Sequence, residues 1–328
     1  MFMKCFCLIE ADLSKLKTDN VTKMSSMFYK CISLKKLNLS NFNTSNVTDM
    51  SDMFRECESL ISLNLSNWNA INVTDMSEIF YKCKSLEELN LSNFKTKKVE
   101  SMSYMFFNCH KLKHLNLSSF NTENVTTMEY LFCGCNSLEE INISNFNTRK
   151  VAFMNSMFLD CSSLKELHIS NFNTSNVLDM MDMFRECKSL KELNLSNFNT
   201  KNLRTTVSMF YGCSSIKELN LSNFNTSNVK SMSCMFVDCS SLKELNLSNF
   251  DTTNVIKMDS MFSGCVNLNN LNISNFKIEK LENADNMFKQ CYSLPQSEIL
   301  QEKFHKKTRN NDEKKYYKKY KKSSCISF

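Results

Sequence analysis

Residues Val47–Asn72 read VTDMSDMFRECESLISLNLSNWNAIN, and blocks of this 26-residue pattern follow one another ten times without an insertion, from Val21 to Lys280. Val177–Asn202, for example, reads VLDMMDMFRECKSLKELNLSNFNTKN. A fixed period of this size is typical of a solenoid, in which each repeat forms one coil that stacks on the coil before it. Each coil then contacts only its neighbours, so the chain builds a long surface and no single closed pocket.

The second half of each block predicts a short β-strand. When places are counted from the leading Val, Leu recurs at places 14, 17 and 19, as in Leu34, Leu37 and Leu39. This L-x-x-L-x-L spacing is typical of leucine-rich repeats. Alternate residues of a strand face opposite sides, so we expect Leu37 and Leu39 in the core and Asn38 at the surface.

The first half of each block predicts a short helix. Met50, Met53, Phe54 and Cys57 are spaced i, i+3, i+4 and i+7, which places them on one helical face. All 3 glycines of the chain fall at place 10, where they indicate a left-handed residue that ends the helix. We therefore expect an α/β repeat solenoid, a leucine-rich-repeat-like superhelix of about 12 coils, each a short strand plus a short helix.

The two ends of the array depart from the repeat. Residues 1–20 match a truncated N-terminal coil that begins in the middle of a block, which leaves open whether further coils precede it, and residues 21–280 hold the ten leucine-rich repeats. Residues 281–307 read as a degenerate repeat and a capping helix with Ile299, Leu300 and Phe304 on one face. Residues 308–328 are rich in Lys, Asn and Tyr without a core pattern, so we expect a disordered polybasic tail.

Positive charge is concentrated at the C-terminus. The formal net charge is +6, and residues 301–328 hold 10 of the 40 Lys and Arg residues but only 3 of the 34 Asp and Glu residues. A basic tail favours anionic lipid or nucleic acid as a partner. No apolar run approaches the ~18 residues of a transmembrane helix, and the apolar run Phe6–Ile9 is too short for a secretory signal peptide.

Most cysteines occupy one register of the repeat. We interpret them as a column of buried thiols, because cysteine behaves as a small apolar residue. Disulfides between neighbouring coils and a metal site are the alternatives, and metal is disfavoured because ligands in a row do not converge on a tetrahedral ion. The twelve cysteines at place 11 are Cys5, Cys31, Cys57, Cys83, Cys109, Cys135, Cys161, Cys187, Cys213, Cys239, Cys265 and Cys291.

The sequence offers no constellation of catalytic residues. The 4 histidines lie at outward places and none is paired with a fixed acid, and 3 glycines cannot form a phosphate-binding loop. We therefore expect no enzyme, cofactor, metal or small-molecule substrate. Most phenylalanines fall at core places, which leaves no stacking platform for specific binding of nucleic acid.

The outward places 16, 18 and 20 of the strand halves form the expected contact surface for a protein ligand, hereafter the strand face. The alternative is that these uniform rows are only a solvated surface. His168 interrupts a row of asparagines and indicates a local preference. In the middle of the array the candidate residues are Glu140, Asn142, Glu166, His168, Glu192, Asn194, Glu218 and Asn220.

The C-terminus matches a lipidation signal. Cys325 is fourth from the end, as in the prenylation motif C-a-a-X, although Ser327 stands where an aliphatic residue is usual. One lipid chain binds membranes weakly, and a polybasic stretch beside anionic lipid supplies the second signal. The six lysines expected to do so are Lys314, Lys315, Lys318, Lys319, Lys321 and Lys322. The alternative is a soluble cytosolic scaffold whose basic tail contacts nucleic acid or acidic proteins.

The blocks Val47–Leu60 (VTDMSDMFRECESL) and Ser215–Val229 (SIKELNLSNFNTSNV) resemble the BspA-like leucine-rich-repeat surface proteins of bacteria and parasitic protists. The resemblance covers nearly all of the chain before the tail. It implies a leucine-rich solenoid, a role in surface attachment, and binding of host or matrix proteins. Some protist members are similar in lacking a signal peptide and ending in a prenylation box. Prenyl transfer is cytosolic, so the chemistry implies the cytoplasmic leaflet of the plasma membrane, whereas the resemblance implies the cell surface.

Overall fold

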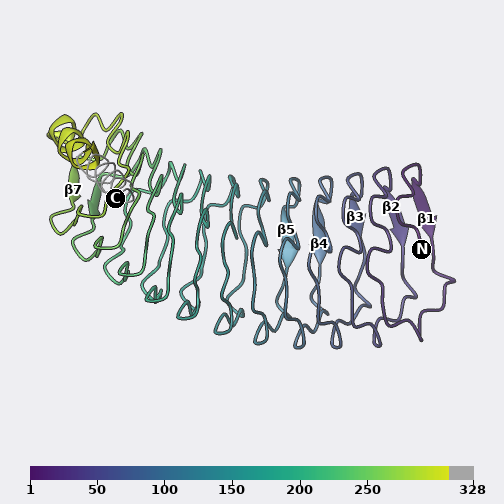
Figure 1. Cartoon of the computed structure of the whole chain (residues 1–328). Coiled ribbons are helices and arrows are strands. Elements are labelled where there is room, and N and C mark those ends of the chain that lie inside the picture. Colours follow the sequence, from purple (N-terminus) through teal and green to yellow (C-terminus); the bar gives the residue numbers. More distant parts are fainter. Residues whose placement is uncertain (310–328) are drawn as a thin grey trace, which may run out of the picture.

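The computed structural model describes residues 1–309, and Figure 1 shows them as one curved row of stacked coils. The predicted register is confirmed by parallel pairing between residues 26 positions apart. Strand β1 (Glu10–Asp12) pairs with β2 (Lys36–Asn38) in this register. A further chain of parallel bridges joins place 3 of every coil to the next, from Lys23–Asp49 to Lys257–Asn283. The backbone therefore returns to lie beside itself once in each block.

The strand halves form three short parallel sheets. Besides β1 and β2, a sheet contains β3 (Ser62–Leu63), β4 (Glu88–Asn90) and β5 (His114–Asn116), and a third contains β6 (Glu244–Asn246) and β7 (Asn270–Asn272). Between β5 and β6 the expected strand segments are not paired as strands. Figure 1 shows the row of coils bending over the same stretch.

The predicted short helices are wrong, because the first half of each coil is a series of turns. Met50, Met53, Phe54 and Cys57 are all fully buried, as the helical pattern required. Their backbone, however, forms i to i−3 hydrogen bonds, such as Met53 N to Met50 O at 3.3 Å and Cys57 N to Phe54 O at 3.0 Å. The intervening N–H groups donate to the next coil, as Phe54 N does to Ile79 O at 2.9 Å. A helix would instead bond each N–H four residues back.

Two left-handed residues in each block make this path possible. Place 10 has a positive φ in every coil, from 55° at Asp238 to 76° at Gly264, which confirms the left-handed position that the glycines indicated. A second left-handed residue, not predicted, lies at place 6, as at Asp52 (φ 57°) and Tyr104 (φ 58°). Side chains at positive φ are costly. The hydrogen bonds to the neighbouring coil offset that cost at each place.

Columns of identical side chains fill the core. Place 8 forms a stack of phenylalanine rings from Phe2 to Phe288, with neighbouring centroids 5.4 to 5.9 Å apart. The column of buried thiols runs beside it and confirms the interpretation of place 11. Each thiol donates to a phenylalanine carbonyl of the preceding coil, as Cys57 does to Phe28 O at 3.2 Å. The core is thus continuous along the array.

Polar ladders tie the turns of neighbouring coils together. Buried Thr44 donates its hydroxyl to Asn69 O at 2.9 Å and accepts from Asn69 N at 2.8 Å. The amide of Asn46 donates to Asp19 O of the preceding coil at 2.8 Å. Buried polar groups are costly unless they are hydrogen-bonded, so these bonds fix the Thr and Asn of the repeat as structural residues.

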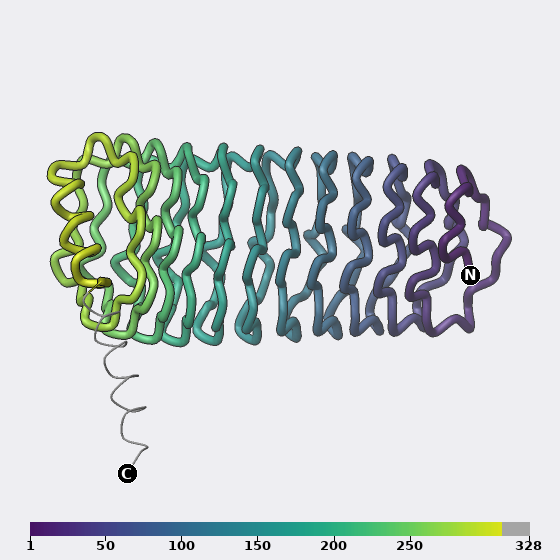
Figure 2. Tube along the Cα trace, turned by 45° about the horizontal axis from the view of Figure 1, so that its top comes forward, coloured from purple at the N-terminus to yellow at the C-terminus, as the bar shows by residue number. Residues whose placement is uncertain are grey.

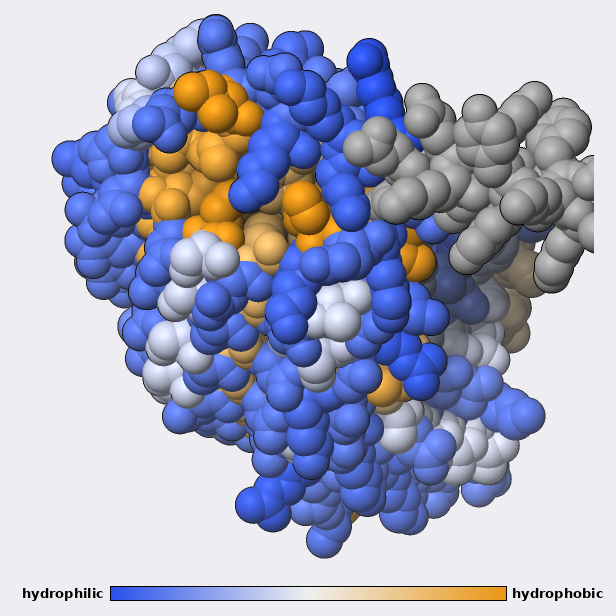
Figure 3. Space-filling view, turned by 60° about the vertical axis from the view of Figure 1, so that its left-hand side comes forward, coloured by the Kyte–Doolittle hydropathy of each residue, from blue (hydrophilic) through white to orange (hydrophobic). Residues whose placement is uncertain are grey.

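A helix at residues 297–309 covers the turn half of the last coil, as Figure 2 shows. Phe304 packs edge-on against Phe288 at 5.8 Å. The side chain of Gln301 makes hydrogen bonds to the last coil that a further coil would otherwise make. Its Oε1 accepts from Phe288 N at 3.0 Å, and its Nε2 donates to Ala284 O at 3.1 Å. Apolar residues remain visible at this end in Figure 3, and Ile299 is 63% exposed.

Candidate functional site

The strand face presents polar side chains over a buried row of aliphatic ones. The buried row includes Ile141, Leu167, Leu193 and Leu219. The alternation follows from the two-residue period of extended backbone. All eight candidate residues of the strand face are exposed: Glu140, Asn142, Glu166, His168, Glu192, Asn194, Glu218 and Asn220.

Part of the strand face is hollowed into an open groove of about 860 Å³. Glu140, Asn142, Glu166 and His168 line it together. The other four candidate residues lie farther along the same face and do not line this groove. The groove begins beside β4 and β5 and reaches residue 168, so it includes the point at which the strand pairing ends. The candidate residues therefore form one exposed face with a hollow at its N-terminal part.

The part of this groove formed by β4, β5 and the residue before β5 was not among the eight candidate residues. Its polar side chains are Glu88, Asn90, Lys113, His114 and Asn116. His114 occupies place 16, where neighbouring coils carry Glu. From residue 88 to residue 244 this is the one place 16 without Glu, and that departure is the signal that the sequence analysis missed.

In these asparagines of the strand face, the side-chain amide oxygen already accepts a hydrogen bond. Asn142 Oδ1 accepts from Ser144 N at 3.2 Å, and Asn194 Oδ1 accepts from Ser196 N at 3.0 Å. Both side chains are exposed, and an amide nitrogen is suited to donate to a ligand. A row of donors beside a row of carboxylates gives the surface mixed polarity.

The charges on this face are solvated. His168 Nε2 lies 3.7 Å from Glu166 Oε2, and the two side chains are 80% and 77% exposed. Lys165 Nζ lies 2.5 Å from Glu139 Oε2, and this hydrogen bond lowers the pKa of Glu139. Catalytic groups are typically desolvated or paired with a partner that tunes their pKa. Nothing in this arrangement indicates catalysis, and the exposed rows are suited to binding.

The predicted lipidation residue Cys325 and the six lysines of the tail lie outside the described residues. Within residues 1–309, no helix combines the length and the apolar character that a membrane crossing requires.

Parallel strands in a 26-residue register, with leucines inside and polar residues outside, define a solenoid of the leucine-rich-repeat type. Three overlapping stretches of the chain, residues 1–115, 100–222 and 208–324, match the family described as "Mycoplasma protein of unknown function, DUF285". The chain belongs to this family. No curated protein matches it.

Solved structures similar to this chain include bacterial leucine-rich-repeat proteins. A leucine-rich cell surface protein from Faecalibacterium prausnitzii is 19% identical, with a TM-score of 0.41 and 84% of this chain and 83% of that chain covered. A leucine-rich-repeat protein from Bacteroides ovatus is also 19% identical, with a TM-score of 0.35 and coverages of 84% and 81%. One from Eubacterium ventriosum is 14% identical, with a TM-score of 0.39 and coverages of 81% and 85%.

Proposed function

We propose that this chain is a non-enzymatic protein-binding module and that the strand face contacts the ligand. The observation that carries the proposal is the uninterrupted row of exposed polar side chains over a buried aliphatic row. Solenoids use such extended surfaces to bind proteins. The groove near His114 and His168 supplies the local shape that an otherwise uniform face lacks.

The proposal extends to a tether at the C-terminus, with a role in adhesion or surface attachment. Prenylation of Cys325 supplies one membrane signal, and the six lysines before it supply about 1 kcal/mol each near anionic lipid. The resemblance to BspA-like surface proteins supports the adhesive role. The chemistry of prenyl transfer supports the cytoplasmic leaflet, and surface display requires an export route of its own.

Charge reversal on the strand face is expected to weaken ligand binding. Glu166, Glu192 and Glu218 are exposed on neighbouring coils, so changing all three to Lys replaces acceptors by cations without disturbing the core. We expect binding to a panel of purified extracellular-matrix proteins to fall at least about tenfold, measured by biolayer interferometry. A triple reversal away from this face, at Glu58, Glu123 and Glu298, is the matched control. Equal loss in both variants, or binding unchanged in the first, contradicts the assignment of the face.

Removal of the lipidation cysteine is expected to release the protein from membranes. The full chain and its Cys325→Ser form are expressed in a eukaryotic cell and fractionated. We expect the wild type in the membrane pellet and the variant in the supernatant, because six lysines without a lipid chain do not hold a protein at physiological salt. Equal partition of the two forms, with an intact mass that shows no prenyl group, favours the soluble scaffold instead.

A further inference from the structure

The surface formed by places 2–10 of the coils, hereafter the turn face, carries an aromatic band that has no counterpart on the strand face. The band consists of half-buried Tyr81, Tyr104, Phe107 and Tyr130. Tyr81 stacks on Phe107 at 4.7 Å, Tyr104 stacks on Tyr130 at 4.6 Å, and the two pairs meet at 5.7 Å. Aromatic residues at partly exposed places are the side chains that dominate protein interfaces.

The turn face around the band is acidic. Residues 48–56, 74–82, 100–108 and 126–134 hold only two cations, Arg55 and Lys82. The strand half differs, because Lys165, Lys191, Lys217 and Lys243 stand at place 15, directly before the glutamates of the strand face. The seven carboxylates in these four stretches are Asp49, Asp52, Glu56, Asp75, Glu78, Glu100 and Glu129.

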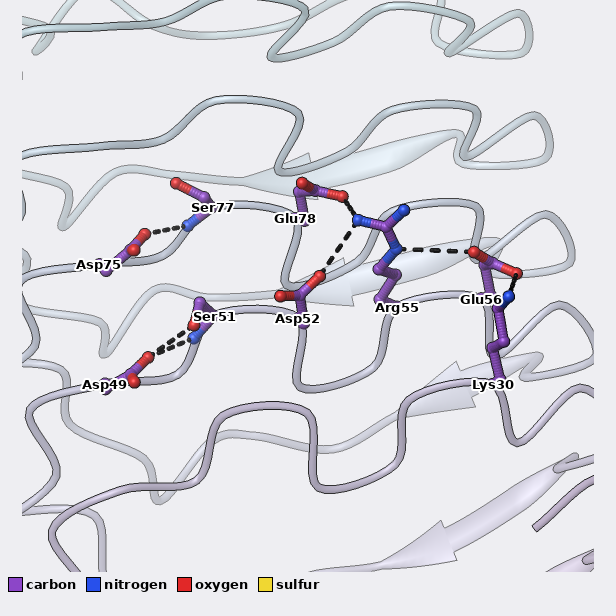
Figure 4. Close-up of polar contacts among 9 residues, drawn as sticks. All are labelled: Lys30, Asp49, Ser51, Asp52, Arg55, Glu56, Asp75, Ser77 and Glu78. Atoms are coloured by element: carbon purple, nitrogen blue, oxygen red, sulfur yellow. Dashed lines mark hydrogen bonds and ion pairs between the residues drawn. The ribbon is translucent and has the colours of Figure 1, made fainter. Parts of the chain in front are cut away.

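Arg55 shows how this face holds a guanidinium group. Figure 4 shows Arg55 between Asp52, Glu56 and Glu78, with ion pairs to all three. Its guanidinium carbon also lies 4.4 Å from the ring centroid of Tyr81. The cation is thus held by carboxylates at its edge and by an aromatic ring at its face.

The same arrangement recurs farther along the turn face. Arg185 pairs with Asp182 at 3.3 Å and lies 4.4 Å from the ring of Tyr211. The two cradles are five coils apart, and in each the arginine at place 9 contacts the aspartate at place 6 of its own coil and the tyrosine at place 9 of the next coil.

The two coils that carry Tyr104 and Tyr130 lack the arginine and have a ring at place 6, where both cradles have an aspartate. Phe107 and Cys133 stand at place 9, and Tyr104 and Tyr130 stand at place 6. Glu129 lies close enough to raise the pKa of Tyr104, after burial and the neighbouring Tyr130. Within residues 1–309, Glu100 and Glu129 form no ion pair in this structure.

We propose that the aromatic band of the turn face docks an arginine-bearing segment of a separate protein, whose guanidinium groups stack on Tyr104 and Tyr130 and pair with Glu129. The surface is negative and aromatic, so it is complementary to a segment that is positive and planar. This docking does not involve the strand face, so a failure of the strand-face proposal would leave it unaffected.

The test uses the full chain and a peptide of six Arg-Gly pairs, with six Asp-Gly pairs as the acidic control. Binding is measured by titration calorimetry and by tyrosine fluorescence. The first variant is Tyr104→Ser with Tyr130→Ser, because Ser26, Ser156 and Ser208 hold the same left-handed place in other coils. The second is Glu129→Gln, which keeps the side-chain size. Emission of the single buried Trp68 reports that each variant is folded.

We expect the arginine peptide to bind, the acidic peptide not to bind, and both variants to lose at least about tenfold in affinity. The control variant Glu298→Gln, which removes one exposed carboxylate from the helix at residues 297–309, should bind the peptide like the wild type. The proposal is overturned if the arginine peptide does not bind, or if the folded variants bind it unchanged. It is also overturned if replacing the six tail lysines by Gln tightens binding about tenfold, since the chain's own tail then occupies the band.

Discussion

The array is expected to unfold cooperatively between about pH 8.5 and pH 10.5, because its buried thiols must stay protonated. Burial raises the pKa of the place-11 thiols from Cys31 to Cys291, to about 12 at Cys109 and about 11 at Cys291. In the unfolded chain the same thiols titrate near the ordinary value, about 8.5. The unfolded state therefore binds fewer protons above that pH, and stability is lost as the pH rises.

The expected effect is large because the column is long. Each thiol contributes a loss of about 1.4 kcal/mol per pH unit above its unfolded pKa. Taken together, the described thiols of the column give a slope on the order of 15 kcal/mol per pH unit, which matches the whole net stability of a typical domain. The thiols with raised pKa at this place are Cys31, Cys57, Cys83, Cys109, Cys135, Cys161, Cys187, Cys213, Cys239, Cys265 and Cys291.

The measurement is a series of urea titrations from pH 7 to pH 10.5 under reducing conditions, followed by Trp68 emission and circular dichroism. Replacing Cys135 and Cys161 by Ala should lower the number of protons released on unfolding by two, which is visible in the slope of the unfolding free energy against pH. Exposed Cys7 replaced by Ala is the control and should leave the slope unchanged. An unfolding free energy that does not change between pH 7 and pH 10.5 would contradict this account.

The core of this fold is predictable from the sequence because burial depends only on register. Once the backbone returns every 26 residues, each apolar place becomes a column, whatever path joins the places. Phe54 and Cys57 are therefore buried as expected, and Leu39 lies inside while Asn38 lies outside. The left-handed place 10 was also predictable, because three coils use Gly there.

The turns were not predictable in the same way, because the side-chain spacing i, i+3, i+4, i+7 fits two different backbones. Successive turns with left-handed residues at places 6 and 10 bury the same side chains as a helix does. What separates the two is the partner of each N–H, and for Phe54 that partner is in the next coil. A local pattern does not report a bond to a residue 25 positions away.

The candidate site was predictable as a face but not as a groove. Alternation along the strand halves places Glu140 and Asn142 outside. The hollow near His114 includes the point after β5 where strand pairing ends, and the L-x-L-S-N pattern is the same before and after that point. The turn face was overlooked for a related reason: its informative residues, such as Arg55 and Tyr104, are those that depart from the repeat.

Removing one ring from the middle of the phenylalanine stack is expected to uncouple the two halves of the array. Phe158 is fully buried and stacks on Phe132 at 5.6 Å and on Phe184 at 5.9 Å. Phe158→Ala should cost about 3 to 5 kcal/mol, because the lost burial is followed by a cavity that the stacked coils cannot close. Phe2→Ala, at the end of the stack with the one neighbour Phe28, is the matched control and should cost less.

Since each coil is held only by its neighbours, hydrogen exchange in Phe158→Ala should accelerate first in the coils flanking residue 158, while the coils near residues 28 and 288 keep their protection. Uniform acceleration along residues 1–309 would show instead that the array unfolds as a single unit.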